Sequence, residues 1–70
     1  ITSIEVERVR TAIRTLNEDH QEVLILRLGQ RLTLRETADI MGKSVAAVKS
    51  LQFRALDNLR NLLKGGTTHG

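Results

Sequence analysis

The sequence predicts an all-α fold, a four-helix domain with a C-terminal helix-turn-helix. Apolar residues recur at spacings of three and four along most of the 70 residues, which is the period of amphipathic helices. Neither the strict alternation of strands nor an Asn-Gly or Asp-Gly hairpin signal occurs. Gly42 and Ser44 place a helix stop two residues before a favoured helix start, which indicates a tight corner.

The first two helices are defined by an apolar stripe and a capping residue. Residues 5–16 predict the first helix, because their aliphatic side chains share one face: Val6, Val9, Ile13 and Leu16. Asn17 is a favoured N-cap, since its side chain can accept from a free backbone N–H. Glu18 and Asp19 then suit the positive end of a second helix, which we expect to end at Gly29.

The third helix is bounded by two local signals. Thr33 with Glu36 fits the capping-box pattern at its start, and Gly42 is the expected left-handed stop. Only Lys43 separates Gly42 from Ser44, the expected N-cap of the fourth helix. Two helices joined by a corner of about three residues cannot lie antiparallel.

The spacing around this corner is typical of a helix-turn-helix. Ala38 stands four residues before Gly42, and the apolar anchors Val48 and Leu51 stand six and nine residues after it. The fourth helix is expected to run to about Leu63. We therefore predict one domain over residues 1–64 and a flexible tail over 65–70.

Positive charge gathers in the second half of the chain. Residues 1–30 carry four basic and five acidic side chains, whereas residues 31–70 carry seven basic and three acidic ones, for a net charge of +3 overall. This asymmetry favours a polyanion as partner of the second half, although a solvated basic face would look the same.

Several other classes of protein are disfavoured. The absence of cysteine argues against disulfides and thiolate metal sites, which favours an intracellular protein. His20 and His69 have no second ligand at metal-site spacing, and no nucleophile–base motif or phosphate loop occurs. We therefore expect no enzymatic activity, no cofactor and no metal. No signal peptide or membrane span is found, and a chain that starts at Ile1 without Met suggests a fragment of a larger protein.

One face of the fourth helix is suited to reading DNA. At 100° per residue, the arc opposite Val48 carries short side chains that permit close approach, a single aromatic ring and basic groups. The predicted base contacts are Lys49, Ser50, Phe53 and Arg54. The predicted phosphate contacts are Arg31, Arg35, Lys43 and Ser44. In the alternative interpretation, the basic side chains are ordinary solvated charges and Phe53 folds back over its own helix.

A second surface concerns protein partners. Between Val23 and Leu28, every residue except Arg27 is aliphatic, so the helix is apolar around its circumference. Such a helix is either central in the fold or partly covered by another protein. In the second case the predicted partner-binding residues are Leu26, Leu56 and Leu63.

The segments "LNEDHQEVLILRL" and "LTLRETADIMGKSVAAVKSLQFRALDNLRNLL" resemble region 4 of bacterial RNA polymerase sigma factors, particularly the extracytoplasmic-function branch. The resemblance covers residues 16–63 and includes the motif residues Val48, Lys49, Ser50, Arg54 and Ala55. Two positions depart from the family pattern, since Leu51 stands where Arg is usual and Gln52 where an aliphatic residue is usual.

The resemblance implies a role in transcription initiation within the bacterial cytoplasm, at the nucleoid. The domain would recognise the promoter −35 element as part of a sigma factor, dock on the β-subunit flap of RNA polymerase core, and be bound by an anti-sigma factor. Two alternatives stay open. One is the DNA-binding domain of a LuxR-type regulator, and the other is a helical protein-interaction module whose helix-turn-helix is covered.

Overall fold

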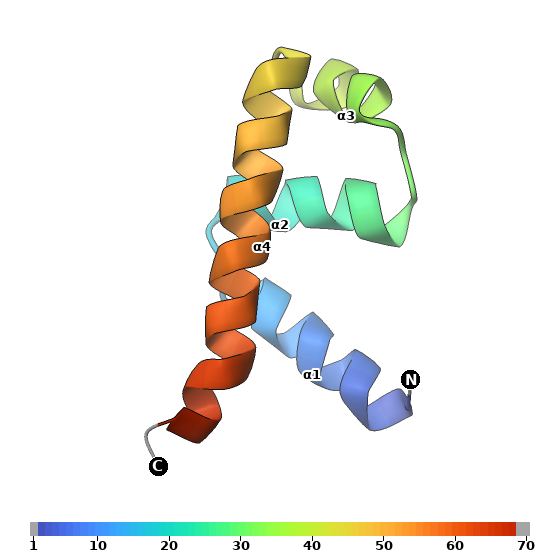
Figure 1. The fold of residues 1–70 in the computed structure, drawn as a ribbon. Coiled ribbons are helices and arrows are strands. Elements are labelled where there is room, and N and C mark those ends of the chain that lie inside the picture. Colours follow the sequence, from blue (N-terminus) through green and yellow to red (C-terminus); the bar gives the residue numbers. More distant parts are fainter. Residues whose placement is uncertain (1, 69–70) are drawn as a thin grey trace.

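The computed structural model describes residues 2–68, and it describes the side chains of residues 2–64. Its elements are the helices α1 (Ser3–Arg14), α2 (Glu18–Leu24), η1 (Ile25–Gly29), α3 (Leu34–Met41) and α4 (Val45–Thr68). Because η1 continues α2 directly, residues 2–68 form the four predicted helical segments, and the all-α prediction is confirmed (Figure 1). Among the described residues, no helix is both long and apolar enough to cross a membrane.

Each predicted capping residue makes the expected hydrogen bond. The Asn17 side chain accepts from the His20 N–H at 2.9 Å. Thr33 and Glu36 form both bonds of a capping box, at 3.0 and 2.8 Å. The Ser44 hydroxyl accepts from the Ala47 N–H at 3.0 Å. These bonds satisfy backbone donors that a helix start leaves without partners, so they fix where α2, α3 and α4 begin.

The predicted bounds of the first helix were two residues off at each end. α1 begins at Ser3 because Thr2 and Glu5 form a second capping box, with bonds of 3.2 and 2.7 Å. It ends at Arg14, and Leu16 is buried just beyond it. The sequence signal for the start was present, since Thr2 and Glu5 have the same spacing as Thr33 and Glu36.

The last turn before Gly29 is a π-helix, which the sequence did not predict. The Gln30 N–H donates to the Ile25 carbonyl at 2.9 Å, and the Leu32 N–H reaches back to Leu26 at 3.0 Å. Arg31, between these donors, has a positive φ of 58°. This conformation costs a residue other than glycine about 1–2 kcal/mol, so the turn after η1 is strained.

The core lies where α1, α2 and α3 meet α4. Figure 1 shows all three branching from the same side of α4, with α2 between the other two. Val23, Leu24 and Val48 are fully buried, and Ala55 and Leu59 continue the buried face of α4. Each buried Val or Leu side chain contributes about 1.5–3 kcal/mol. Because α2 lies between α1 and α3 and packs against α4, most of its apolar side chains are buried within the domain and need no partner protein to cover them.

The predicted end of the fourth helix was wrong. α4 continues through Thr68, five residues beyond Leu63. Each added residue of an existing helix gains one backbone hydrogen bond, and no proline interrupts the sequence, so extension is inexpensive even across Gly65 and Gly66. The side chains of residues 65–68 and the whole of 69–70, including His69, lie outside the described part, so the predicted flexible tail stays a prediction.

Candidate nucleic-acid interface

The corner between α3 and α4 has the predicted geometry. Gly42 adopts φ 67° and ψ 35°, the left-handed conformation that ends a helix. The Lys43 N–H then donates back to the Ala38 carbonyl at 3.0 Å, which is the helix-ending bond of a Schellman motif. With Ser44 capping the next helix, the chain turns sharply from α3 into α4 within three residues. The predicted sharp bend at Gly42 is confirmed.

The faces of α4 divide as a reading helix requires. Val48 is fully buried, and Ala38 on α3 is 3% exposed, so the two helices of the corner pack through small or branched side chains. The opposite face carries one shallow depression, here named the reading surface. It is lined by Ala46, Lys49, Ser50, Phe53 and Arg54. All four predicted base-contact residues therefore lie together.

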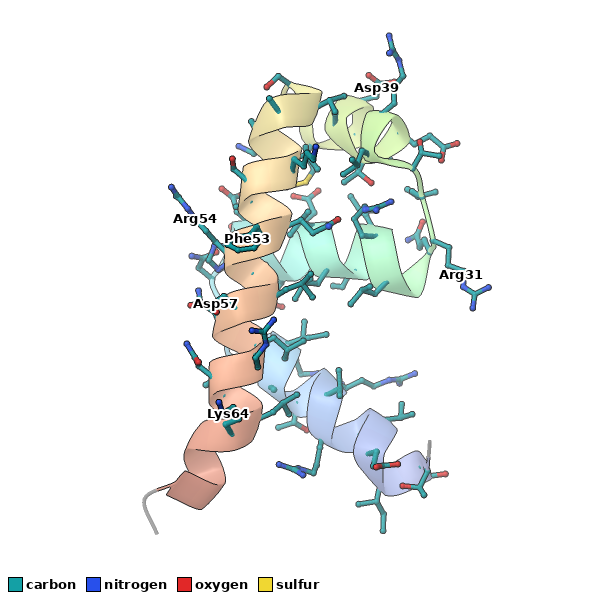
Figure 2. All side chains as sticks on the ribbon, in the orientation of Figure 1. Arg31, Asp39, Phe53, Arg54, Asp57 and Lys64 are labelled. Atoms are coloured by element: carbon teal, nitrogen blue, oxygen red, sulfur yellow. The ribbon has the colours of Figure 1, made fainter. Side chains whose placement is uncertain are left out.

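Phe53 is the most exposed large apolar side chain of this surface. Its exposed fraction is 76%, so the ring is not folded onto its own helix. Figure 2 shows Arg54 extending from the side of α4 that lies away from α1, α2 and α3. An exposed aromatic ring beside exposed basic groups is a surface that can contact both base edges and phosphates.

The predicted phosphate contacts are exposed but dispersed. Lys43 and Ser44 lie at the corner next to the reading surface, and Arg35 lies in the first turn of α3. Arg31 extends from the loop after η1, on the opposite side of the view from Arg54 (Figure 2). The structure therefore groups Lys43 and Ser44 with the reading helix and leaves Arg31 apart.

Lys43 already has an acidic neighbour. Its Nζ lies 3.9 Å from Asp19 Oδ2, and the two side chains are 36% and 58% exposed. An exposed pair at this distance contributes at most about 1 kcal/mol, so it can be exchanged for a phosphate. The pair also links the start of α2 to the corner.

The predicted partner-binding residues are buried or half-buried, so they offer little surface to a partner. Leu26 is 7% exposed, whereas Leu56 and Leu63 are half-buried and pack against the core. The exposed aliphatic side chains of η1 are instead Ile25 and Leu28, at 47% and 54%.

An apolar groove lies between α1 and α4, and of the three predicted partner-binding residues it is lined by Leu63 alone. Its lining includes Ile4, Ala12, Leu62 and Leu63, and Ile4 is 74% exposed. At one edge the Arg8 guanidinium donates to the Leu63 carbonyl at 3.2 Å. The rest of this groove was not predicted, because Ile4 lay before the expected start of the first helix.

Two buried or half-buried polar groups also have partners that the sequence did not reveal. His20 Nδ1 lies 3.1 Å from Asn58 Nδ2, which ties the start of α2 to α4. The Arg27 guanidinium donates to Gln52 on α4 and to the Leu32 carbonyl. Within residues 2–68, no group of His, Asp and Glu side chains gathers in a way that could hold a metal ion.

Comparison with known proteins places this fold in a family. The model of "Sigma-70, region 4" matches residues 12–61, which include the helix-turn-helix and the whole reading surface. The chain belongs to the sigma-70 region 4 family. This confirms the resemblance found in the sequence, and it disfavours a LuxR-type domain.

The region 4 domain is similar to parts of several longer sigma factors. The extracytoplasmic-function sigma factor BldN of Streptomyces coelicolor is 48% identical over 52 residues, which cover 74% of this chain and 20% of the relative. ShbA of Streptomyces griseus is 36% identical over 62 residues, covering 89% and 32%. YlaC of Bacillus subtilis is 36% identical over 63 residues, covering 89% and 36%. The chain thus spans about a fifth to a third of these relatives.

One solved structure has the same fold. A chain of the RsbN–BldN complex superposes with a TM-score of 0.81 and 41% identity, covering 83% of this region 4 domain and 42% of that chain.

Proposed function

We propose that this chain is the part of a sigma factor that binds the promoter −35 element and so directs RNA polymerase to promoters. The observation that carries the proposal is the reading surface, exposed on the helix that follows the Gly42 corner. In a helix-turn-helix, this second helix enters the major groove. The domain would act in the bacterial cytoplasm, at the nucleoid.

Each side chain of the reading surface has a role that its chemistry supports. Arg54 can donate two bonds to guanine O6 and N7, and Ser50 is short enough to let the helix approach the bases. Phe53 can pack against a thymine methyl or a sugar, and Lys49 can contact a base edge or a phosphate. These contacts form and release without a covalent step, so the proposed mechanism is docking and not catalysis.

Phosphates would be held by side chains outside the reading surface. Lys43 and Ser44 adjoin it at the corner, Arg35 lies in the first turn of α3, and Arg31 lies apart on the loop before α3, where it would contact a separate phosphate.

A fluorescence titration of −35-type and scrambled duplexes at two salt concentrations tests the proposal. We expect tighter binding to the −35 duplex, with both affinities falling steeply as salt rises, because bound phosphates release counterions. Replacing thymines by deoxyuridines removes only methyl groups and would locate a contact with Phe53. Equal affinity for both duplexes would show that the domain does not read sequence.

Protein docking is a second proposed role. The groove between α1 and α4 exposes Ile4 and Leu62 over a floor that includes Ala12, which suits the apolar face of a partner helix. The fold match to a chain of the RsbN–BldN complex supports a protein partner. The β-subunit flap of RNA polymerase and an anti-sigma factor are the partners that we propose. Ile4→Ser should weaken their binding while leaving DNA binding unchanged.

A further inference from the structure

Arg27 connects the two helices of the helix-turn-helix at a point away from their corner. Its Nε donates to Gln52 Oε1 on α4, and its Nη1 donates to the carbonyl of Leu32. Leu32 directly precedes Thr33, the N-cap of α3. Arg27, Gln52 and Leu32 are all half-buried, so water competes less with these bonds than it would on an open surface. We name the three groups the Arg27 bridge.

The position of the bridge allows it to restrict the angle between α3 and α4. α3 has eight residues and is about 12 Å long, with the Gly42 corner at one end and the bridge at the other. Opening the angle between α3 and α4 by about 10° would move the start of α3 by about 2 Å. Such a shift exceeds what a hydrogen bond tolerates, so an intact bridge holds the angle within a few degrees.

Two features of this chain make the bridge possible. Gln52 occupies a position where the family pattern has an aliphatic residue, and an aliphatic side chain cannot accept a hydrogen bond from Arg27. The second feature is the turn that follows the π-helix, in which the Leu32 N–H donates to the Leu26 carbonyl six residues back and so draws the loop toward Arg27. Gln52 also directly precedes Phe53, so the bridge meets α4 beside the reading surface.

We infer that Arg27 and Gln52 are positioning residues for promoter recognition. Their hydrogen bond fixes the angle between α3 and α4, so that phosphate contacts from α3 and base contacts from α4 fit one duplex together. This inference rests on the proposed −35 binding. Loss of the bridge should therefore lower the affinity for the specific duplex, where both sets of contacts must fit, more than the affinity for a non-specific duplex.

Five variants test the inference by titration of −35 and scrambled duplexes. Gln52→Leu removes the acceptor, and Arg27→Lys keeps the charge but loses the fork that spans two acceptors. Each should lower the ratio of specific to scrambled affinity by about tenfold, the value of one hydrogen bond to a charged group. The double variant should lose no more than either single variant, because both remove the same interaction.

The fourth variant, Asn61→Leu, is the matched control. It makes the same polar-to-Leu change on an exposed part of α4 away from the bridge, and it should leave the ratio unchanged. Gln52→Glu adds a rescue test. It keeps an acceptor for Arg27, so it should preserve the ratio while weakening both duplexes through its negative charge.

The outcomes separate three explanations. If Gln52→Leu loses discrimination and Arg27→Lys keeps it, Gln52 contacts DNA by itself and the inference is wrong. If both variants weaken the two duplexes equally, in step with a smaller folded fraction, the bridge only stabilises the fold and the inference is also wrong.

A third outcome concerns the proposed function. If the unaltered chain fails to discriminate between duplexes, the −35 proposal fails. The bridge is then judged by NMR, from the exchange rate of the Arg27 Nε–H and the α3–α4 angle given by residual dipolar couplings. Gln52→Leu should speed that exchange by about tenfold and change the angle. An unchanged angle would overturn the inference independently of DNA.

Discussion

Gly42→Ala tests the corner that presents the reading surface. The substitution adds a single methyl group, and a Cβ at this position meets no atom within 4 Å. Overpacking is therefore excluded, and the expected effect comes from backbone conformation alone. Gly42 has φ 67°, a left-handed conformation that is strained for alanine.

Two opposing terms set the size of the effect. The left-handed conformation costs alanine about 1–2 kcal/mol relative to glycine. Alanine also restricts the unfolded chain more than glycine does, which returns about 0.4–1 kcal/mol. We therefore expect the free energy of unfolding to fall by about 1 kcal/mol. Gly42→Asn should cost less, because asparagine adopts this conformation more readily.

Urea denaturation followed by far-UV circular dichroism measures this difference. For a domain of this size, a loss of about 1 kcal/mol lowers the denaturation midpoint by about 1 M. Gly29→Ala is the matched control, because Gly29 has no positive φ and its added Cβ would make only an ordinary 4.0 Å contact with Ile25. That variant should be neutral or slightly stabilising. Equal midpoints for Gly42→Ala and the unaltered chain would refute the reasoning.

Three further predictions concern charge and capping. Arg54→Ala should weaken −35 binding by about 1–3 kcal/mol and relax the preference at one base, whereas Lys43→Ala should weaken specific and scrambled duplexes alike in the same titration. Equal losses on both duplexes for Arg54→Ala would remove its reading role. Asp19→Asn should tighten both complexes by less than about 1 kcal/mol, because it frees Lys43 from the 3.9 Å pair, and weaker binding would contradict this. Thr33→Ala should lower the free energy of unfolding by about 1 kcal/mol, since the Glu36 N–H loses its cap, and an unchanged urea midpoint would count against it.

The features predicted correctly from the sequence are those that depend on residues close together in the sequence. Asn17, Thr33 and Ser44 cap helices through bonds to residues three positions away, so their role can be read without knowing the fold. The left-handed stop at Gly42 is local in the same sense. Helical periodicity also predicted that Val48 is buried and that the opposite face of α4 is exposed. The residues of the reading surface lie on that exposed face.

The features that were missed depend on neighbours distant in the sequence or on the backbone alone. A π-helical turn shifts backbone bonds by one residue and leaves no side-chain pattern, so Ile25–Gly29 read as an ordinary helix end. The groove beside Ile4 depends on where α1 lies against α4. The Arg27–Gln52 bond did leave a signal, since a polar residue at the edge of the apolar stripe and a lone charge in an aliphatic segment each require a partner.

The reading surface and the core lie on opposite faces of α4. Substitutions on the core face should therefore change stability, whereas loss of the Arg27 bridge should change specificity. Lys49 adjoins the buried Val48, and Arg54 adjoins the buried Ala55, but Lys49 and Arg54 are themselves exposed and are placed by the backbone of α4. Val48→Ala should therefore reduce the amount of folded protein, with a loss of about 2 kcal/mol in stability, yet leave the specificity of the folded fraction intact. The Arg27 bridge acts on the angle between α3 and α4, so Gln52→Leu should show the reverse pattern, with specificity lost and most of the stability kept. A domain with so small a core can thus hold its base contacts rigidly through α4, while the fit to the phosphates depends also on the Arg27 bridge between α4 and the start of α3.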